Sequence, residues 1–257
     1  MKTILMLNKL AKRFPKKFAK MNHDYVGLMT GKRPEEIKKI FICLDMDYDV
    51  LDQVIEAKPD VVITHHPFIF GTKAKVFKYD LMKKELAEKL DSLNIPVYSF
   101  HTNFDTGRGG MNDALAEALG LTNIYAPEKN IMMRIGELKE EMDVVEFAKL
   151  ARKSFHVDYS LLVDSGKRNV KKVGIIGGGG SRSWSLAKEE GCDIYISGDA
   201  PHYVRRDIVN NKYNYLDMPH EIEKIFMPTM KKLLLEIDSN LEIIEVDHEK
   251  LPKVIID

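Results

Sequence analysis

Histidines stand at or just past the ends of three apolar runs of this chain, usually with a carboxylate nearby. These runs, with the residues that follow them, are 61–64 with His65 and His66, 95–100 with His101 and Asp105, and 213–217 with His220, Glu221 and Glu223. Imidazole and carboxylate groups are ligands for first-row metals such as zinc, iron, manganese, nickel and cobalt. The recurrence of this pattern at strand ends predicts a metal site shared by distant parts of the sequence.

The number of ligands is large enough for two cations. We predict that His65, His66, Asp105, His220 and a glutamate hold a pair of divalent ions, because one carboxylate can bridge two metals. Paired metals lower the pKa of a bridging water and clamp an attacking and a leaving oxygen. Taken singly, each residue has a simpler reading, with Asp105 in a turn and His220 in the first turn of a helix. No cysteine joins the set, which argues against a closed structural zinc site.

The segments that would position these residues alternate between strand-like and helix-like patterns. The expected strands are 38–46, 60–66, 95–101, 131–137, 158–163, 171–176, 192–197, 213–217 and 241–246. The expected helices are 4–20 with a stop or kink at Pro15, 48–58, 78–92, 111–120, 142–154, 182–190, 201–210 and 220–236. This alternation predicts an α/β fold with mostly parallel central sheets flanked by helices. Ligands of such sheets bind at the carboxyl ends of the strands.

The chain is expected to form two related α/β halves. Residues 121–130 lose their periodicity and are the predicted linker. The first half, 1–125, carries His65, His66, His101 and Asp105. The second half, 126–257, returns the C-terminal His/Glu ligands to the shared metal site.

Composition restricts the class of protein only broadly. The 257 residues are 44% apolar and 30% charged, and 39 basic residues balance 39 acidic ones. Nucleic-acid binding is therefore possible but is not indicated by net charge. A basic cluster within residues 12–20 has near-helical spacing, which favours a solvated helix face over a track for phosphates. Cys43 and Cys192 are expected to be small core residues in a reducing compartment, the cytoplasm. No run of the sequence reaches the ~18 apolar residues of a membrane span.

Three further groups have two readings each. Gly177–Gly180 joins a strand to a helix, where bare amides could hold an anion or simply allow close packing. Asp199 is expected mainly to cap the helix that begins near Pro201. His101 and His202 are candidate acid/base residues or supports for metal ligands.

Several blocks of the sequence resemble one protein family. The chain resembles the NGG-one-interacting-factor-three-like proteins, also called GTP cyclohydrolase 1 type 2 homologues, over nearly its whole length. The matching blocks are His23-Asp24-Tyr25-Val26-Gly27-Leu28, Ile63 to Phe70 around His65-His66-Pro67, His101 to Asp105, Gly109 to Asp113, Gly198-Asp199, and His220 with its glutamate.

The resemblance implies a dinuclear metal centre, two related α/β halves and assembly into a hexameric ring. The family pattern places the glutamate four residues after the histidine, but position 224 is a lysine here. Glu223 is the better replacement and Glu221 the second choice, because residues three apart share a helix face and neighbours do not.

The preferred hypothesis is a metal-dependent hydrolase, cyclohydrolase-like by resemblance, that acts on a small or nucleotide-like substrate. The alternative is a non-enzymatic, ring-shaped metal-binding scaffold or regulator. A third reading is a metal-free phosphate-binding protein that uses Gly177–Gly180.

Overall fold

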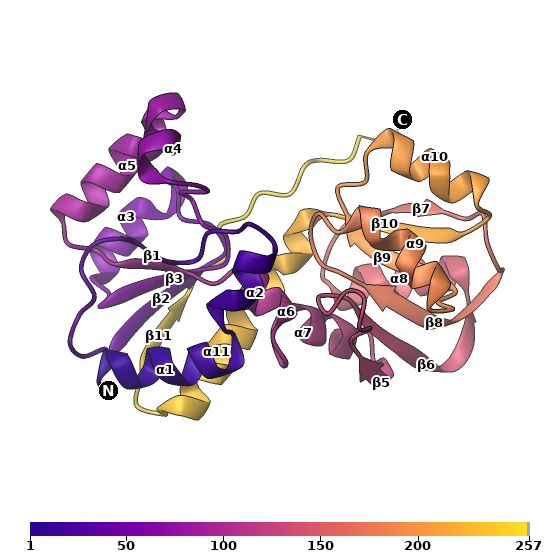
Figure 1. Ribbon diagram of the computed structural model, residues 1–257, viewed down its shortest axis with the longest axis horizontal. Coiled ribbons are helices and arrows are strands. Elements are labelled where there is room, and N and C mark those ends of the chain that lie inside the picture. The colour runs from indigo at the N-terminus through magenta and orange to yellow at the C-terminus, as the bar shows by residue number, and fades with distance from the viewer. Residues whose placement is uncertain (256–257) are drawn as a thin grey trace. The chain divides into compact units, whose positions relative to one another are not determined.

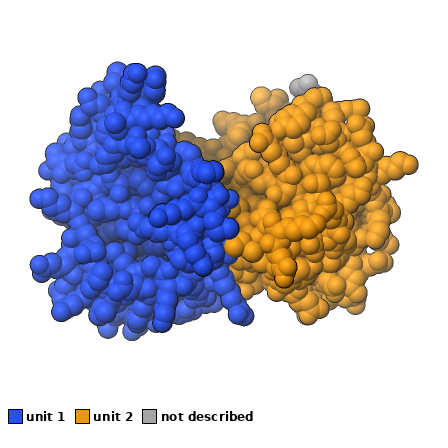
Figure 2. Space-filling view, viewed as in Figure 1, with its two compact units in different colours: residues 1–110, 226–249 blue, residues 111–225, 250–257 orange. Residues whose placement is uncertain are grey.

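The chain divides into two compact units, each built around its own sheet (Figure 1). The computed structural model describes residues 1–255. Unit 1 comprises Met1–Gly110 and Phe226–Glu249, and unit 2 comprises Met111–Ile225 with the residues from Lys250 on (Figure 2). This division differs from the predicted halves, 1–125 and 126–257. The difference arises because the segment after residue 225 adds a helix and a strand to unit 1.

The sheet of unit 1 is mostly parallel. Its strand order is β1-β4-β3-β2-β11, and only the pairing of β1 with β4 is antiparallel within the described residues. The strands are β1 (Gly27–Thr30), β2 (Lys39–Cys43), β3 (Val61–Thr64), β4 (Val97–Ser99) and β11 (Glu242–Glu245). All four residues of β3 are buried, as expected for a central parallel strand with helices on both faces.

Helices cover both faces of this sheet. They are α1 (Thr3–Arg13), α2 (Lys16–Met21), α3 (Tyr48–Ala57), α4 (Lys73–Tyr79), α5 (Leu81–Ser92), α6 (Thr102–Thr106) and α11 (Phe226–Ile237). Figure 1 shows α3 and α5 on one side of the strands and α1 and α11 on the other. Buried Val54 and Leu90 pack with Val62 of β3 in one apolar cluster. Pro15 separates α1 from α2, as predicted.

The sheet of unit 2 is mixed. Its order is β5-β6-β8-β9-β10-β7, with β8, β9 and β10 parallel and the other neighbours antiparallel. The strands are β5 (Thr122–Tyr125), β6 (Arg134–Asp143), β7 (Leu161–Val163), β8 (Asn169–Ile175), β9 (Ile194–Gly198) and β10 (Asn214–Met218). The helices are α7 (Met111–Ala118), α8 (Val144–Ser154), α9 (Trp184–Glu189) and α10 (His202–Asn210), with short 3₁₀ turns η1 (Ser181–Ser183) and η2 (His220–Ile225).

The predicted α/β class is confirmed, and several local expectations are corrected. The predicted linker 121–130 contains β5, which pairs with β6. The predicted helix 78–92 is broken at Asp80, whose carboxylate instead caps α5 by accepting from the Lys83 amide. The predicted helix 220–236 begins as a 3₁₀ turn and becomes α-helical only at Phe226. Strand β1 was not predicted. No helix among residues 1–255 has the length and apolar character needed to cross a membrane.

A buried ion pair fixes α7 against β6 in unit 2. The guanidinium of Arg134, a residue only 4% exposed, donates to both carboxylate oxygens of Asp113 and to backbone carbonyls of residues 131–133. Replacing one partner of such a pair leaves a buried charge without compensation.

We expect Arg134→Met to lower the free energy of unfolding of the protein by about 3 kcal/mol, measured by urea denaturation. The matched control is Arg168→Met. Arg168 is 68% exposed in its pair with Asp143, and this change should cost less than about 1 kcal/mol. Equal losses in the two variants would contradict this account of the buried pair.

Candidate metal centre

Three imidazole rings converge in unit 1 where β3 and β4 end. His65 and His66 follow β3, and His101 follows β4 at the start of α6. The ring centroid of His65 lies 4.9 Å from that of His66 and 5.1 Å from that of His101. The centroids of His66 and His101 are 5.5 Å apart. One nitrogen of each ring lies within 4.8 Å of the others, a spacing that could hold one metal ion.

A backbone turn lets two consecutive histidines serve one site. The amides of His65 and His66 both donate to the carbonyl of Leu44, at 3.0 and 3.1 Å. The Thr64 hydroxyl donates to the His66 carbonyl, which bends the chain after β3. An extended strand would have pointed the two side chains to opposite faces.

Each of these rings is held through its Nδ1 atom. Nδ1 of His65 is 2.8 Å from the Phe100 carbonyl, so Nδ1 must carry the proton and donate, because a carbonyl can only accept. Nδ1 of His66 lies 2.8 Å from Asp45, and Nδ1 of His101 lies 2.9 Å from Asp24. Such contacts fix the tautomer and ring orientation of metal-binding histidines and assign Nε2 to the metal.

Burial and charge support the same arrangement. His65 is fully buried, and its Nε2 lies 3.5 Å from the carboxylate of Asp105, which is 7% exposed. Burial alone would raise the pKa of Asp24 and of Asp45. Hydrogen bonds and charge from their histidine partners outweigh the effect of burial, so the pKa of each carboxylate is lowered. Burial alone would lower the pKa of His101, but the Asp24 hydrogen bond and the charges of Asp105 and Asp24 raise it. The surroundings of the histidine cluster therefore stabilise these carboxylates in their charged form, which is the form that binds cations.

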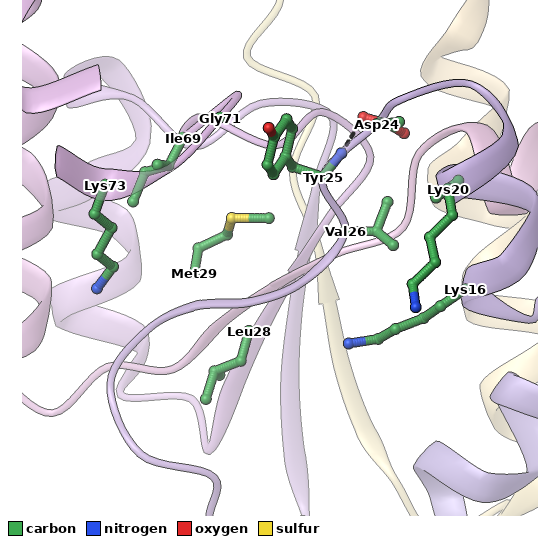
Figure 3. Close-up of a pocket in the computed structure, with 11 residues that line it drawn as sticks. Lys16, Lys20, Asp24, Tyr25, Val26, Leu28, Met29, Ile69, Gly71 and Lys73 are labelled. Atoms are coloured by element: carbon green, nitrogen blue, oxygen red, sulfur yellow. Dashed lines mark hydrogen bonds between the residues drawn. The ribbon is translucent and has the colours of Figure 1, made fainter. Parts of the chain in front are cut away.

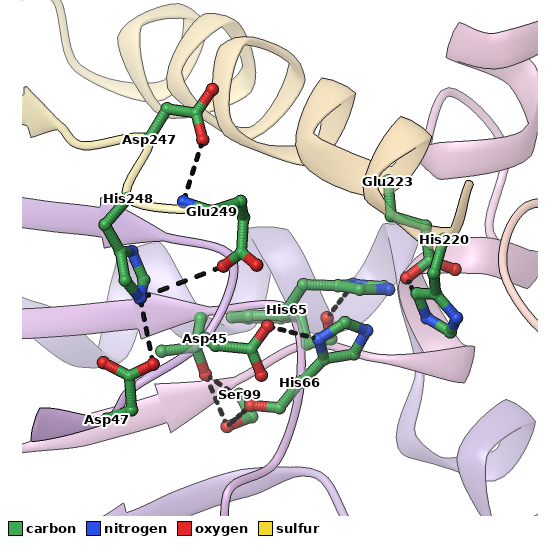
Figure 4. A network of polar contacts seen from close by, with 12 residues as sticks. Asp45, Asp47, His65, His66, Ser99, His220, Glu223, Asp247, His248 and Glu249 are labelled. Carbon is green, nitrogen blue, oxygen red and sulfur yellow. Dashed lines mark hydrogen bonds and ion pairs between the residues drawn. The ribbon is translucent and has the colours of Figure 1, made fainter. Parts of the chain in front are cut away.

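A second histidine–carboxylate pair lies in unit 2, at η2. Nε2 of His220 is 3.0 Å from the carboxylate of Glu223, and Nδ1 contacts the carboxylate of Asp199. Burial alone would lower the pKa of His220, but Glu223 and Asp199 together raise it to about 9. Figure 4 shows His220 beside Glu223, and both residues offer atoms that can ligate a metal.

The glycine run supports this pair by close packing. Gly178 has φ +58°, and a Cβ there would lie 2.2 Å from Oε1 of Glu223 and 3.1 Å from Cε1 of His220. The Gly178 carbonyl accepts from the Gly198 amide and the Ser197 hydroxyl, and the Gly177 amide donates to Asn112. Of the two readings of Gly177–Gly180, the structure favours close packing, because a carboxylate rather than an anion-binding hollow occupies this position.

The structure also distinguishes among the remaining candidates. Glu223 is 4% exposed and contacts His220, whereas Glu221 is absent from the ligand groups found among the described residues. His202 is exposed at the start of α10 and also lies outside those groups. Asp199 does not cap α10, because its carboxylate is directed to His220 instead. The metal-binding and catalytic roles themselves stay predictions.

Sequence reasoning missed the carboxylates that orient the histidines. Asp45 follows β2 at the same sheet edge as His65 and His66, so parallel strand ends could have indicated it. Asp24 comes from the loop before β1, and only folding brings it to His101.

The architecture and its histidine–carboxylate groups define an α/β protein with residues that could bind metal. The sequence profile of Duf34/NIF3 (NGG1p interacting factor 3) matches residues 1–252, and the chain belongs to this family. The expected resemblance is thereby confirmed.

Named relatives and solved structures agree with this assignment. A "GTP cyclohydrolase 1 type 2 homolog" of Clostridium perfringens is 30% identical, covering 91% of this chain and 92% of the relative. A protein of the same name from Lactococcus lactis is 28% identical, covering 93% of each chain. The structure of reduced HcgD from Methanocaldococcus jannaschii superposes with a TM-score of 0.80 at 27% identity, covering 96% of this chain and 98% of that one. A Bacillus cereus protein related to NIF3 shares the fold, with a TM-score of 0.85 at 23% identity over 100% and 99% of the chains.

The Gly178 contact gives a test of the pair in unit 2. We expect Gly178→Ala to displace the Glu223 carboxylate, so that the pKa of His220 falls from about 9 toward its ordinary value of 6.5. The measurement is the NMR titration of the His220 imidazole in chelator-treated protein.

The matched control is Gly191→Ala. Gly191 also has a positive φ, +78°, but a Cβ there would meet nothing within 4 Å. This control variant should keep the wild-type pKa of His220. An unchanged pKa in Gly178→Ala would show that Gly178 does not hold Glu223 against His220.

Proposed function

We propose that this protein binds divalent cations through its histidines and carboxylates, and uses them to activate water in a hydrolytic reaction on a small substrate. The observation that carries the proposal is the convergence of three imidazoles in unit 1, each bonded through Nδ1 to an oxygen. That arrangement is typical of histidines whose Nε2 atoms bind a metal.

The chemistry of the donor set favours a reactive metal over a structural one. Imidazole and carboxylate ligands suit zinc, iron, manganese, nickel or cobalt, and thiolates are missing from the described clusters. A bound cation of this kind supplies Lewis acidity and lowers the pKa of its water. The protein's own groups hold the imidazoles of His65 and His66 in the ligating tautomer, and His101, which is outside the proposed ligand set, would exchange a proton at the site.

The nature of the substrate is proposed from the relatives. The name "GTP cyclohydrolase 1 type 2 homolog" favours a nucleotide-like substrate for this chain. The proposal includes two cations per chain, held by His65, His66, Asp105, His220 and Glu223. It also includes a hexameric ring, as the family resemblance implies, which light scattering on the purified protein would test. A cytoplasmic location is proposed from the two unpaired, buried cysteines.

Metal content gives the first test. We expect protein purified without chelator to contain up to two transition-metal ions per chain by elemental analysis, and His65→Ala to lose at least one, because His65 is a buried ligand. His202→Ala is the matched control and should keep the wild-type content. A metal-free wild-type protein that takes up none of these ions on reconstitution would refute the proposal.

The orienting carboxylate gives the second test. Asp45→Asn should weaken metal binding by about tenfold or more, because loss of such a hydrogen-bonded support typically costs 10- to 100-fold. The control is Asp49→Asn, on the first turn of α3, where the affinity measured by competition with a chromogenic chelator should stay unchanged. Equal affinities of wild type and Asp45→Asn would show that Asp45 does not support a ligand.

Turnover separates the enzyme from the scaffold. If the protein is a hydrolase, His66→Ala abolishes hydrolysis of nucleoside triphosphates or related phosphates while the oligomer mass is retained. If it is a scaffold or regulator, the wild type has no turnover to lose, and binding of its partner survives the same change.

A further inference from the structure

A pocket of about 350 Å³ lies in unit 1, and its lining includes Asp24, the partner of His101. It is lined by residues of α2, of β1 with the loop before it, and of the segment after β3 (Figure 3). The volume is at the lower end of the range of sites for small ligands, roughly 300–1,000 Å³. It is therefore large enough for a compact molecule and too small for a folded partner.

Two lysines give one side of this pocket a positive charge. Lys16 and Lys20 stand four residues apart on α2 and so share one face of the helix. Figure 3 shows both side chains reaching toward the same part of the pocket. Within residues 1–255, neither ammonium forms an ion pair, whereas Lys73, across the pocket, lies 3.4 Å from Asp91.

The position of the Lys16 ammonium is defined by its surroundings. Nζ of Lys16 is 5.7 Å from the centre of the Tyr98 ring, and it lies 2.5 Å from the point where a Cβ on Gly27 would be. Gly27, with φ +111°, therefore leaves room for this ammonium over β1.

The acidic residue of the lining does not neutralise the lysines. The side chain of Asp24 is 1% exposed, and its carboxylate accepts from the amides of Tyr25 and Thr102, from the Thr102 hydroxyl and from His101. These donors already occupy the Asp24 carboxylate, and neither lysine forms an ion pair with it within residues 1–255. The pocket consequently keeps a net positive charge.

The opposite side offers an apolar surface that includes the exposed ring of Tyr25, and the ring of Phe70, which is outside the lining itself, packs on Tyr25. Tyr25 and Phe70 meet edge to face with centroids 5.7 Å apart, and they are 42% and 54% exposed. Buried Met29 and Ile69 form the floor beside them. Exposed aromatic rings next to a cationic pocket are suited to a planar or apolar group that carries an anion.

The pocket adjoins the histidine cluster within the same unit. Asp24 belongs to the pocket wall and accepts from Nδ1 of His101 at 2.9 Å. The ring of Phe70 lies 6.4 Å from that of His101, centroid to centroid. A ligand bound here would thus place part of itself next to His101.

We propose that this pocket binds a small organic phosphate, with its phosphate on Lys16 and Lys20 and its planar part against Tyr25 and Phe70. The assignment deepens the proposed function, on which it rests, by naming the substrate class of the site next to His101. The basic cluster is exposed, as expected of a solvated helix face, and two of its members, Lys16 and Lys20, also line this pocket. Lys17, on the same helix, instead lies over the ring of Phe18.

Calorimetric titration with phenyl phosphate tests this proposal on the 257-residue chain. We expect phenyl phosphate to bind about tenfold more tightly than either inorganic phosphate or phenol, since it makes both sets of contacts. Lys16→Gln/Lys20→Gln should lose about tenfold or more in affinity, because charge-assisted contacts to phosphate are lost. The matched control, Lys17→Gln, changes net charge on the same helix and should bind like the wild type.

Phe70→Ala separates the contact with the planar group from the contact with the phosphate. It should weaken phenyl phosphate several-fold and leave inorganic phosphate unchanged. Absence of phenyl phosphate binding up to about 10 mM, or equal losses in Lys17→Gln and the double variant, would overturn the proposal.

The titration is repeated in chelator-treated His66→Ala, where capture of phosphate by a bound metal is removed. Retained binding in His66→Ala supports the pocket independently of the metal. Binding that disappears there, while Lys16→Gln/Lys20→Gln binds normally, assigns the phosphate to the metal and overturns the pocket. The metal content of the double variant should stay at the wild-type level, so that failure of the pocket and failure of the metal centre are distinguishable.

Discussion

The hydrogen bond from Nδ1 of His65 to the Phe100 carbonyl is the constraint on which the candidate site depends. It joins the ends of β3 and β4, and it holds Nδ1 of a fully buried imidazole in one tautomer through a backbone carbonyl instead of a carboxylate. His66 and His101 follow the same principle with Asp45 and Asp24 as acceptors. A backbone carbonyl cannot be protonated, so this anchor of the cluster keeps its function at any pH at which the protein stays folded.

Parallel pairing explains why these groups meet. The register of β2, β3 and β4 places Cys43 beside Thr64 and Thr64 beside Ser99, so the chain leaves all three strands at one edge of the sheet. Asp45, His65 and His101 each come within two residues of those ends. The buried Thr64 and Ser99 hydroxyls are hydrogen-bonded at 2.7 Å and so connect the ends of β3 and β4. The polar groups collect there because the buried strands are apolar and these residues follow directly after the strands end.

Much of this arrangement could be predicted from local patterns, and the rest required long-range information. Runs such as 61–64 and 194–197 signal buried strands, so their ends and the histidines there were predictable. Strands β1 and β5 were not predicted, because exposed residues interrupt their apolar pattern. They are recognisable as strands from their pairing, β1 with β4 and β5 with β6. The return of 226–249 to unit 1 leaves no local trace, since β11 resembles any other strand. Asp24 was missed for the same reason: its contact with His101 spans 77 residues.

The discontinuity of unit 1 has a consequence for how the protein forms during synthesis. Unit 2 is continuous in sequence up to Ile225, whereas unit 1 is completed only by Phe226–Glu249. Phe226 packs on the rings of His65 and Phe104, and β11 supplies the edge strand beside β2. A nascent chain on the ribosome therefore has all three clustered histidines outside the exit tunnel long before the aromatic cover of His65 is made. The order of elements along the chain makes maturation of this cluster one of the last events of folding, after the intervening unit has been synthesised.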